Sequence, residues 1–439
     1  MASSSASLRN YGTLVRTNRN FRYIWFGEIV SLLGDWFNLI ASATLVGLLT
    51  NSGVALGGLF VVRMLAPFLV STFGGPLIDR YNRKHILIVT DVLRGVVVLG
   101  FLFIREPSHV PWIYLLTALQ LGLSGIFFPA RNALFPDIVA RHELGTANAL
   151  SSSTWSTMLA IGTALGGFVA GGLGINVAFM LDSLTFFLSA LFIAAIAYQP
   201  NEAELPPTAP ARTRPTNGAV AAILNGYREG FAYLREQPHI FFLILQKSFV
   251  MFCFATAYDV TAVAISQNVF VIGQGGGIGL GLIYATVGIG TGVGPILMRM
   301  WTGDDEQKLR FAIMISYCIS AFGMFLAAPM VTTGYSFTIF LIGLIIRGFG
   351  GGTVWVFASQ LGLQTIADRV RGRVFATEFA LFSLMASLAA ASAGWALERP
   401  AVGYGGVVWT LPVLTMIPAL LWAIALRRAQ RQRVEVQVP

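Results

Sequence analysis

The residues that could do chemistry in this 439-residue chain are acids placed inside long apolar stretches. The first stretch carries polar side chains three and four residues apart: Glu28, Ser31, Asp35, Asn38 and Ser42. That spacing puts all five on one face of a helix. We predict that this face lines a central cavity; the alternative is hydrogen bonding between helices. A carboxylate that is alternately buried and hydrated can bind and release a proton, so we predict that Asp35 is a proton carrier.

Other charges also fall inside apolar stretches, where an ionisable side chain is costly and marks a functional site. The acids are Glu28, Asp35, Asp91, Asp182, Asp259 and Glu378, and bases at comparable positions are Arg63, Arg94, Lys247 and Arg347. We predict that Arg63 is the partner of Asp35 and that Glu28 pairs with Lys247 across the cavity. Arg347 precedes a glycine run and would either bind an anionic substrate group or hold a helix kink.

The amino-acid composition indicates the class of protein in which these charges lie. Hydrophobic residues make up 55% of the chain and charged residues 11%, with a mean hydropathy of +0.71, against about 45–50% and about 25% in a soluble domain. These values exclude a cytoplasmic enzyme, a nucleic-acid-binding domain and a secreted disulfide scaffold. No phosphate-binding loop, metal-ligand spacing or nucleophile–base pattern occurs. We therefore expect no enzyme, no metal and no cofactor, with a proton gradient as the energy source.

A helix needs about 20 apolar residues to cross a bilayer. Twelve stretches meet this requirement: 22–49, 54–78, 85–104, 111–134, 148–172, 175–198, 239–263, 277–300, 309–331, 335–362, 374–397 and 405–426. The sequence thus predicts an all-α membrane protein of twelve transmembrane helices. Similar segments recur about 220–230 residues apart in the two halves, which favours two six-helix bundles related by pseudo-two-fold symmetry.

Basic residues set the orientation of these spans. Most of the 29 Lys and Arg flank alternate ends of successive spans, and the opposite loops hold only Arg105 and Arg399. Because basic residues stay on the cytoplasmic side, both termini are predicted to be cytoplasmic. The predicted divisions are a cytoplasmic segment 1–21, a bundle 22–198, a cytoplasmic linker 199–238, a bundle 239–426 and a basic cytoplasmic tail 427–439. The linker has helical periodicity over 219–237, which indicates an amphipathic helix or an extension of the seventh span.

The loop after the second span contains Gly-Gly-Pro-Leu-Ile-Asp-Arg-Tyr-Asn-Arg-Lys over residues 74–84. It resembles the signature loop of the major facilitator superfamily, although Asn82 stands where that family usually has glycine. The matching residues are Gly75, Asp79, Arg80, Arg83 and Lys84. The resemblance implies a cytoplasmic gate in which Asp79 faces a neighbouring helix N-terminus and the basic residues pair with acids such as Asp137. We place Asp91, Arg94 and Arg131 in the same gating network.

Three further segments resemble the bacterial efflux branch of that superfamily, which exports siderophores, macrolides and drugs. They are residues 31–36, 91–95 and 129–136. Span five carries Gly162, Gly166 and Gly167, similar to a glycine-rich antiporter signature, although tight helix packing explains such glycines equally well.

The resemblance and the intramembrane acids together predict a secondary active transporter. We expect a proton-coupled exporter of amphipathic or lipophilic small molecules, such as drugs or siderophores, that works by alternating access. The alternatives are a proton symporter importing a small anionic solute on Arg63 and Arg347, or a lipid flippase. The expected partners are the small-molecule substrate, protons and the lipid bilayer, with no nucleic acid. The expected location is the plasma (inner) membrane, and the expected form is a monomer.

Overall fold

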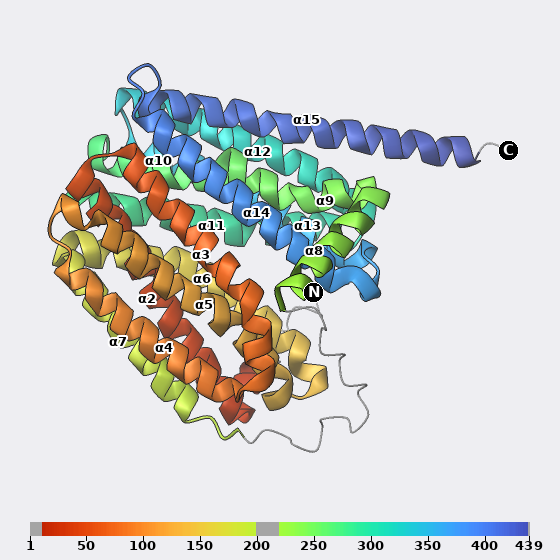
Figure 1. Ribbon diagram of the computed structural model, residues 1–439. Helices are drawn as coiled ribbons and strands as arrows, with labels where there is room; N and C mark the ends of the chain where they lie inside the picture. The colour runs from red at the N-terminus through yellow and green to blue at the C-terminus, as the bar shows by residue number, and fades with distance from the viewer. Residues whose placement is uncertain (1–10, 199–218, 438–439) are drawn as a thin grey trace.

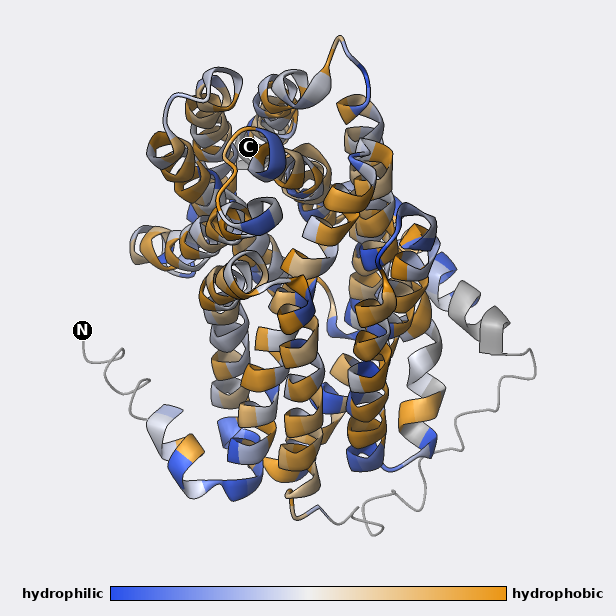
Figure 2. Ribbon diagram, turned by 90° about the vertical axis from the view of Figure 1, so that its left-hand side faces the viewer, coloured by the Kyte–Doolittle hydropathy of each residue, from blue (hydrophilic) through white to orange (hydrophobic). Residues whose placement is uncertain are grey.

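The computed structural model describes residues 11–198 and 219–437. Twelve helical spans in these ranges are long and apolar enough to cross a bilayer, which confirms the predicted number. The described ranges contain helices and no strand, as the all-α prediction requires. Hydrophobic residues dominate the long helices (Figure 2). Large apolar side chains such as Phe103 (76% exposed) and Met300 (81% exposed) point outward, where only lipid would shield them.

The first half of the chain supplies six spans. They are α2 (Arg19–Thr50), α3 (Gly53–Arg80), α4 (Arg83–Leu99), α5 (Val110–Ile138), α6 (Leu144–Phe168) and α7 (Ile175–Ala194). Polar side chains cap the first turns of α2, α3 and α4. Ser52 caps α3 by accepting the Ala55 backbone N–H, and Asn82 caps α4 by accepting the Lys84 N–H.

The second half supplies the other six spans and one additional helix. They are α8 (Ala219–Glu236), α9 (Pro238–Val250), α10 (Thr256–Asn268), α11 (Gly277–Thr302), α12 (Glu306–Thr333), α13 (Phe337–Thr365), α14 (Asp368–Leu397) and α15 (Gly403–Gln437). A π-helical turn over Met251–Ala255 joins α9 and α10 into one span. The last helix, α15, runs well past its neighbours (Figure 1).

The helix predicted in the linker is α8, and it is separate from the seventh span because the chain leaves helical geometry at Gln237. It packs against α14 and α9. A carboxylate–guanidinium pair between Glu229 and Arg373 ties it to α14. Leu234 of the predicted apolar face is buried, whereas Phe231 is 52% exposed.

The spans pack as two groups, α2–α7 and α9–α15. Contacts between the groups run mainly along two helix pairs, α3 with α14 and α6 with α11. Glycines allow these pairs to approach closely: a Cβ atom on Gly57 would lie 2.6 Å from the Ala390 carbonyl oxygen, and one on Gly167 would lie 2.6 Å from the Gly281 Cα. The halves therefore touch backbone to backbone along these seams.

Two ends of the molecule are distinguished by charge. The basic end holds the α3–α4 loop, the α5–α6 loop, α8 and the start of α14, with Arg80, Arg83, Arg141, Arg369 and Arg371. The far end holds the α2–α3 loop, the α4–α5 loop and the α14–α15 loop, with Arg105 and Arg399.

Candidate functional site

The buried charges of the first half centre on an ion pair between α2 and α4. The Arg94 Nη2 atom lies 2.7 Å from Asp35 Oδ1 and 2.8 Å from Asp35 Oδ2. The Arg94 side chain is fully buried, whereas the Asp35 side chain keeps 17% of its surface exposed. One guanidinium nitrogen thus contacts both carboxylate oxygens, and a charge-assisted pair of this kind is strong. The Asp35 carboxylate thus pairs with a buried base, while part of the Asp35 side chain stays accessible.

Arg94 also contacts other groups. Its Nη1 atom lies 3.2 Å from Asp91 Oδ1, one helical turn away, and 3.3 Å from the Ser31 hydroxyl. Its guanidinium carbon lies 3.9 Å from the centre of the Phe186 ring on α7. Gln120 on α5 donates to Asp35 at 3.5 Å. One guanidinium therefore binds two carboxylates, so the charge on either acid affects the other.

A second buried pair lies nearer the basic end. Arg131 on α5 forms an ion pair with Glu28 on α2. The Ser151 hydroxyl on α6 donates to the same Glu28 oxygen at 2.6 Å. This pair joins three helices of the first half.

Among the described residues of the second half, one ion pair is buried. Lys247 Nζ on α9 lies 2.8 Å from Glu378 Oε2 on α14, and 5.1 Å from the centre of the Trp355 ring. The exposed fraction is 9% for the Lys247 side chain and 6% for that of Glu378. A buried charge remains charged at tolerable cost when it is paired in this way.

The remaining two arginines have no acidic partner within ion-pair distance. Arg347 donates through Nε to the Phe254 carbonyl at 3.0 Å and stacks 4.4 Å from the centre of the Tyr258 ring. The π-helical turn containing Phe254 frees that carbonyl from the regular helical pattern. Arg63 on α3 has a buried Nη1 atom that meets no hydrogen-bond partner among the described residues.

The structure corrects several predicted partners. Asp35 pairs with Arg94 and not with Arg63, and Glu28 pairs with Arg131 and not with Lys247. The reason is the packing of neighbouring helices: α2 lies against α6 and α7, and its charged face meets bases from α4 and α5 of its own half. Arg94 and Arg131 thus pair with acids of α2, and Arg94 also pairs with Asp91 of the predicted gating network.

The polar face of α2 is largely enclosed. Glu28, Ser31, Asn38 and Ser42 are each at most 4% exposed, and Asp35 is the member with appreciable accessible surface. The prediction that the whole face lines a cavity is therefore wrong. Most of the face is occupied by contacts between helices, which was the alternative interpretation.

The signature loop forms a network at the basic end. The expected pair between Arg83 and Asp137 is present at 2.7 Å. Lys84 Nζ donates to the Ile196 carbonyl at 2.7 Å, and the Tyr198 hydroxyl donates to Asp137 at 3.0 Å. Partial burial and the Asp137 carboxylate raise the pKa of the Tyr198 hydroxyl. The sequence did not indicate Tyr198, because its partner is 61 residues away.

The other members of the loop make fewer contacts. Arg80 is exposed and lies 5.7 Å from the centre of the Tyr81 ring. A Cβ atom on Gly75 would meet nothing within 4 Å. The side chain of Asp79 lies outside the described residues. The contacts given for Arg83 and Lys84 all stay within the first half.

At the far end, the two halves share a hydrogen-bonded carboxylate. Glu398, just after α14, accepts a hydrogen bond from the Ser52 hydroxyl at 2.5 Å and one from the Val54 backbone N–H at 3.1 Å. The Ser52 and Val54 donors lower the pKa of this exposed carboxyl below its ordinary value. Gln267 adds a second link by donating to the Thr44 carbonyl at 3.1 Å.

The span-five glycines have packing roles in the structure. A Cβ atom on Gly162 would lie 2.7 Å from the Trp36 ring, and one on Gly166 would lie 3.1 Å from the Phe37 ring. Gly167 meets Gly281 of α11, as described above. These glycines thus let α6 contact α2 on one side and the second half on the other.

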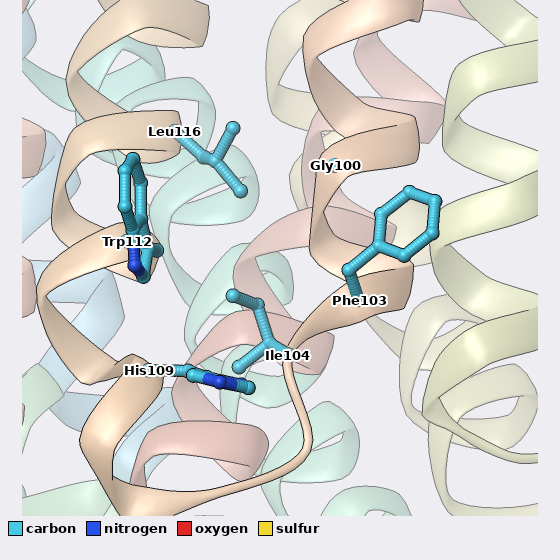
Figure 3. A pocket seen from close by; sticks show the side chains of 6 residues that line it. All are labelled: Gly100, Phe103, Ile104, His109, Trp112 and Leu116. Atoms are coloured by element: carbon cyan, nitrogen blue, oxygen red, sulfur yellow. The ribbon is translucent and has the colours of Figure 1, made fainter.

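A hollow of about 350 Å³ lies apart from the charged residues, between the end of α4 and the start of α5 (Figure 3). Its lining is mostly apolar and includes Ile104, His109, Trp112 and Leu116. Phe103 and Trp112 are largely exposed, so the hollow opens on the outer surface of the bundle. Among the described residues, no group of three or more His, Cys, Asp or Glu could hold a metal ion.

Two six-span groups, with ion pairs inside them and glycine seams between them, define a polytopic membrane transporter of the two-bundle kind. The family model of the Major Facilitator Superfamily matches residues 24–390, and the chain belongs to that family. It is a transporter and not an enzyme.

Relatives and solved structures agree with this assignment. The chain is 26% identical over 368 residues to the putative bacilysin exporter BacE of Bacillus amyloliquefaciens, covering 83% of this chain and 86% of the relative. It is 24% identical over 327 residues to the enterobactin exporter EntS of Salmonella choleraesuis (strain SC-B67), covering 73% of each. The crystal structure of a D-xylose–proton symporter superposes with a TM-score of 0.68 at 14% identity, covering 91% and 97%. The last similarity concerns the fold alone.

Proposed function

We propose that this transporter is a proton-coupled antiporter that exports amphipathic or lipophilic small molecules by alternating access. The observation that carries the proposal is the Asp35–Arg94 pair, in which a buried base holds an acid that remains accessible. The similarity to a putative bacilysin exporter and to an enterobactin exporter supports export of a small organic molecule.

The pair offers a simple way to couple a proton to a change of conformation. When Asp35 is ionised, its charge balances Arg94. When Asp35 binds a proton, Arg94 loses its charged partner and keeps the longer contact with Asp91. This loosens the link between α2 and α4, so protonation favours a different packing of the first half. Release of the proton restores the link.

We propose that the basic end faces the cytoplasm, with both termini there, in the plasma membrane. The concentration of arginines at that end supports this orientation. The far-end contacts of Glu398 and Gln267 would then hold the outer side closed. We propose that the protein acts as a monomer, because the accessible acid and both six-span groups lie within one chain.

Purified protein in lipid vesicles with a trapped pH dye tests the coupling. Bacilysin, enterobactin and an amphipathic dye such as ethidium are added in turn to energised vesicles. We expect at least one of them to move protons opposite to itself, and Asp35→Asn to reduce that movement at least tenfold. Asp304→Asn is the matched control, because Asp304 is 70% exposed and pairs with Arg299 in a loop. Unchanged proton movement in Asp35→Asn would exclude Asp35 as the carrier.

One observation favours a second candidate, a proton symporter for a small anionic solute. The buried Arg63 Nη1 atom has no partner and could bind a carboxylate or phosphate. In the same vesicles, protons that move in the same direction as the solute would support this candidate and contradict export. Transport of fluorescent lipid without any proton movement would point to a flippase.

A further inference from the structure

One fully buried acid of the first half takes no part in the pairs described above. Asp182, in the middle of α7, is 0% exposed. Neither of its carboxylate oxygens meets a hydrogen-bond donor among the described residues. By contrast, Glu28, Asp35, Asp91 and Glu378 each have a basic partner within ion-pair distance.

Packing fixes Asp182 between α2 and α4. Its Oδ1 atom lies against the backbone of Gly34, where an added Cβ atom would come within 2.5 Å of that oxygen. The next residue, Ser183, donates its hydroxyl proton to the Gly95 carbonyl at 2.8 Å. Asp182 thus contacts the residue before Asp35, and Ser183 contacts the residue after Arg94.

Arg94 lies beside the same face of α7. It stacks on Phe186, which lies one helical turn after Asp182 on the same face of α7. The charged groups that interact with Asp182 come from three other helices: Asp35 of α2, Arg94 of α4 and Arg63 of α3. The Asn38 amide of α2 is the potential hydrogen-bond donor beside it. Asp91, also on α4, shares Arg94 with Asp35.

The charges in this cluster do not balance if every acid is ionised. Asp35, Asp91 and Asp182 surround Arg94, which already binds the first two. A buried carboxylate without a basic partner is far more costly than a neutral carboxyl group. The acid without a partner is therefore the one that is neutral.

We propose that Asp182 holds a proton in this conformation and is a second proton site that exchanges with Asp35 through Arg94. The proton leaves a carboxyl oxygen of Asp182 and binds a carboxylate oxygen of Asp35. Arg94 then leaves the neutral Asp35 and pairs with the newly ionised Asp182. One proton moves between two carboxyl groups, and the net charge of the cluster stays the same.

The role of this exchange in a transport cycle rests on the proposed proton coupling, but the protonation of Asp182 does not. Infrared spectroscopy tests it without a substrate. The full chain is placed in vesicles of phosphatidylethanolamine and phosphatidylglycerol, and the carbonyl band of protonated carboxyl groups is recorded at pH 7 with and without ¹³C-labelled aspartate. We expect a label-sensitive band in the wild type. A wild-type spectrum without such a band overturns the proposal without any variant.

Variants assign the band. Asp182→Asn should remove it and leave the thermal unfolding temperature nearly unchanged, because the amide resembles a neutral carboxyl group in shape and charge. Asp304→Asn should keep the band. A band that persists in Asp182→Asn places the proton elsewhere and overturns the proposal.

A third variant tests the exchange. Asp35→Asn frees Arg94 to pair with Asp182, so the Asp182 band should disappear there as well. A band that persists in Asp35→Asn contradicts the exchange. Protein that shows the band but transports nothing in the vesicle assay would refute the proposed function and leave the Asp182 proton in place.

Discussion

The two halves of the chain have the same six-span arrangement but hold their buried charges differently. In the first half, Arg94 serves two acids and a third acid, Asp182, has no partner. In the second half, Lys247 and Glu378 form a one-to-one pair. An excess of acids around a single base can take up a proton, whereas a balanced pair gains nothing by doing so. This difference supports the proposal that the first half carries the proton.

Arg347 makes the contrast clearer. It occupies the interior of the second half, as Arg94 does in the first, but it binds a backbone carbonyl and an aromatic ring. A carbonyl does not titrate, so the contact of Arg347 with Phe254 does not depend on the protonation of an acid. The contact of Arg94 with Asp35 does depend on it.

Removal of the central base should have the largest effect. We expect Arg94→Gln to destabilise the protein by about 3–5 kcal/mol, because it leaves two buried carboxylates without their base. Arg347→Gln should cost about 1–3 kcal/mol, because it leaves a carbonyl unpaired. Unfolding by titrated denaturing detergent in mixed micelles compares the two variants. Equal costs would remove the distinction between the halves.

The pair in the second half can be removed as a unit. Lys247→Met and Glu378→Leu should each destabilise the protein, and the double variant should recover about 2 kcal/mol of that loss, because no buried charge remains alone. We also expect proton movement in vesicles to survive in the double variant. If it disappeared, proton handling would extend into the second half.

The seam between the halves can be tested with a single methyl group. Gly57→Ala should destabilise the closed far end by about 1–2 kcal/mol, because the new Cβ atom would lie 2.6 Å from the Ala390 carbonyl oxygen. Gly292→Ala on α11 is the control, because a Cβ atom there would meet nothing within 4 Å. Thermal unfolding of the two variants should separate them, and similar losses would contradict the close contact of α3 with α14.

The smallest effect concerns the exposed Glu398 contact and depends on pH. Since the folded structure lowers the pKa of Glu398, its contact with Ser52 stabilises the closed far end above the ordinary glutamate pKa and is lost as the pH falls through the lowered value. In a chain with Cys253 and Cys318 replaced by serine, a cysteine introduced by Thr50→Cys should react faster with a membrane-impermeant maleimide as the pH falls towards that value, after correction for the reagent's own pH dependence.

Glu398→Gln supplies the control for that experiment. Its labelling should be fast throughout and independent of pH after the same correction, because the amide does not titrate. A pH response that survives in Glu398→Gln would assign the response to another group.

Some features of the protein follow from the sequence alone. Twelve apolar stretches predict twelve spans, because a helix of about 20 apolar residues suits a bilayer whatever its neighbours are. Contacts between residues one turn apart, such as Asp91 with Arg94, also follow from helical spacing. The signature loop indicated the pairing of Arg83 with Asp137, since both lie at span ends on the same predicted side.

Only the tertiary structure decided which helices meet. Helical periodicity puts Glu28 and Asp35 on one face, but it does not say which bases that face contacts. The packing of α2 within its own half brings Arg131 and Arg94 to these acids and leaves Arg63 and Lys247 elsewhere. Asp182 is isolated for the same reason: its sequence neighbours are ordinary, and only the positions of Gly34 and Gly95 in space enclose it. The hydropathy of a segment alone decides whether it can span the membrane, whereas an ion pair also depends on how two helices are placed relative to each other.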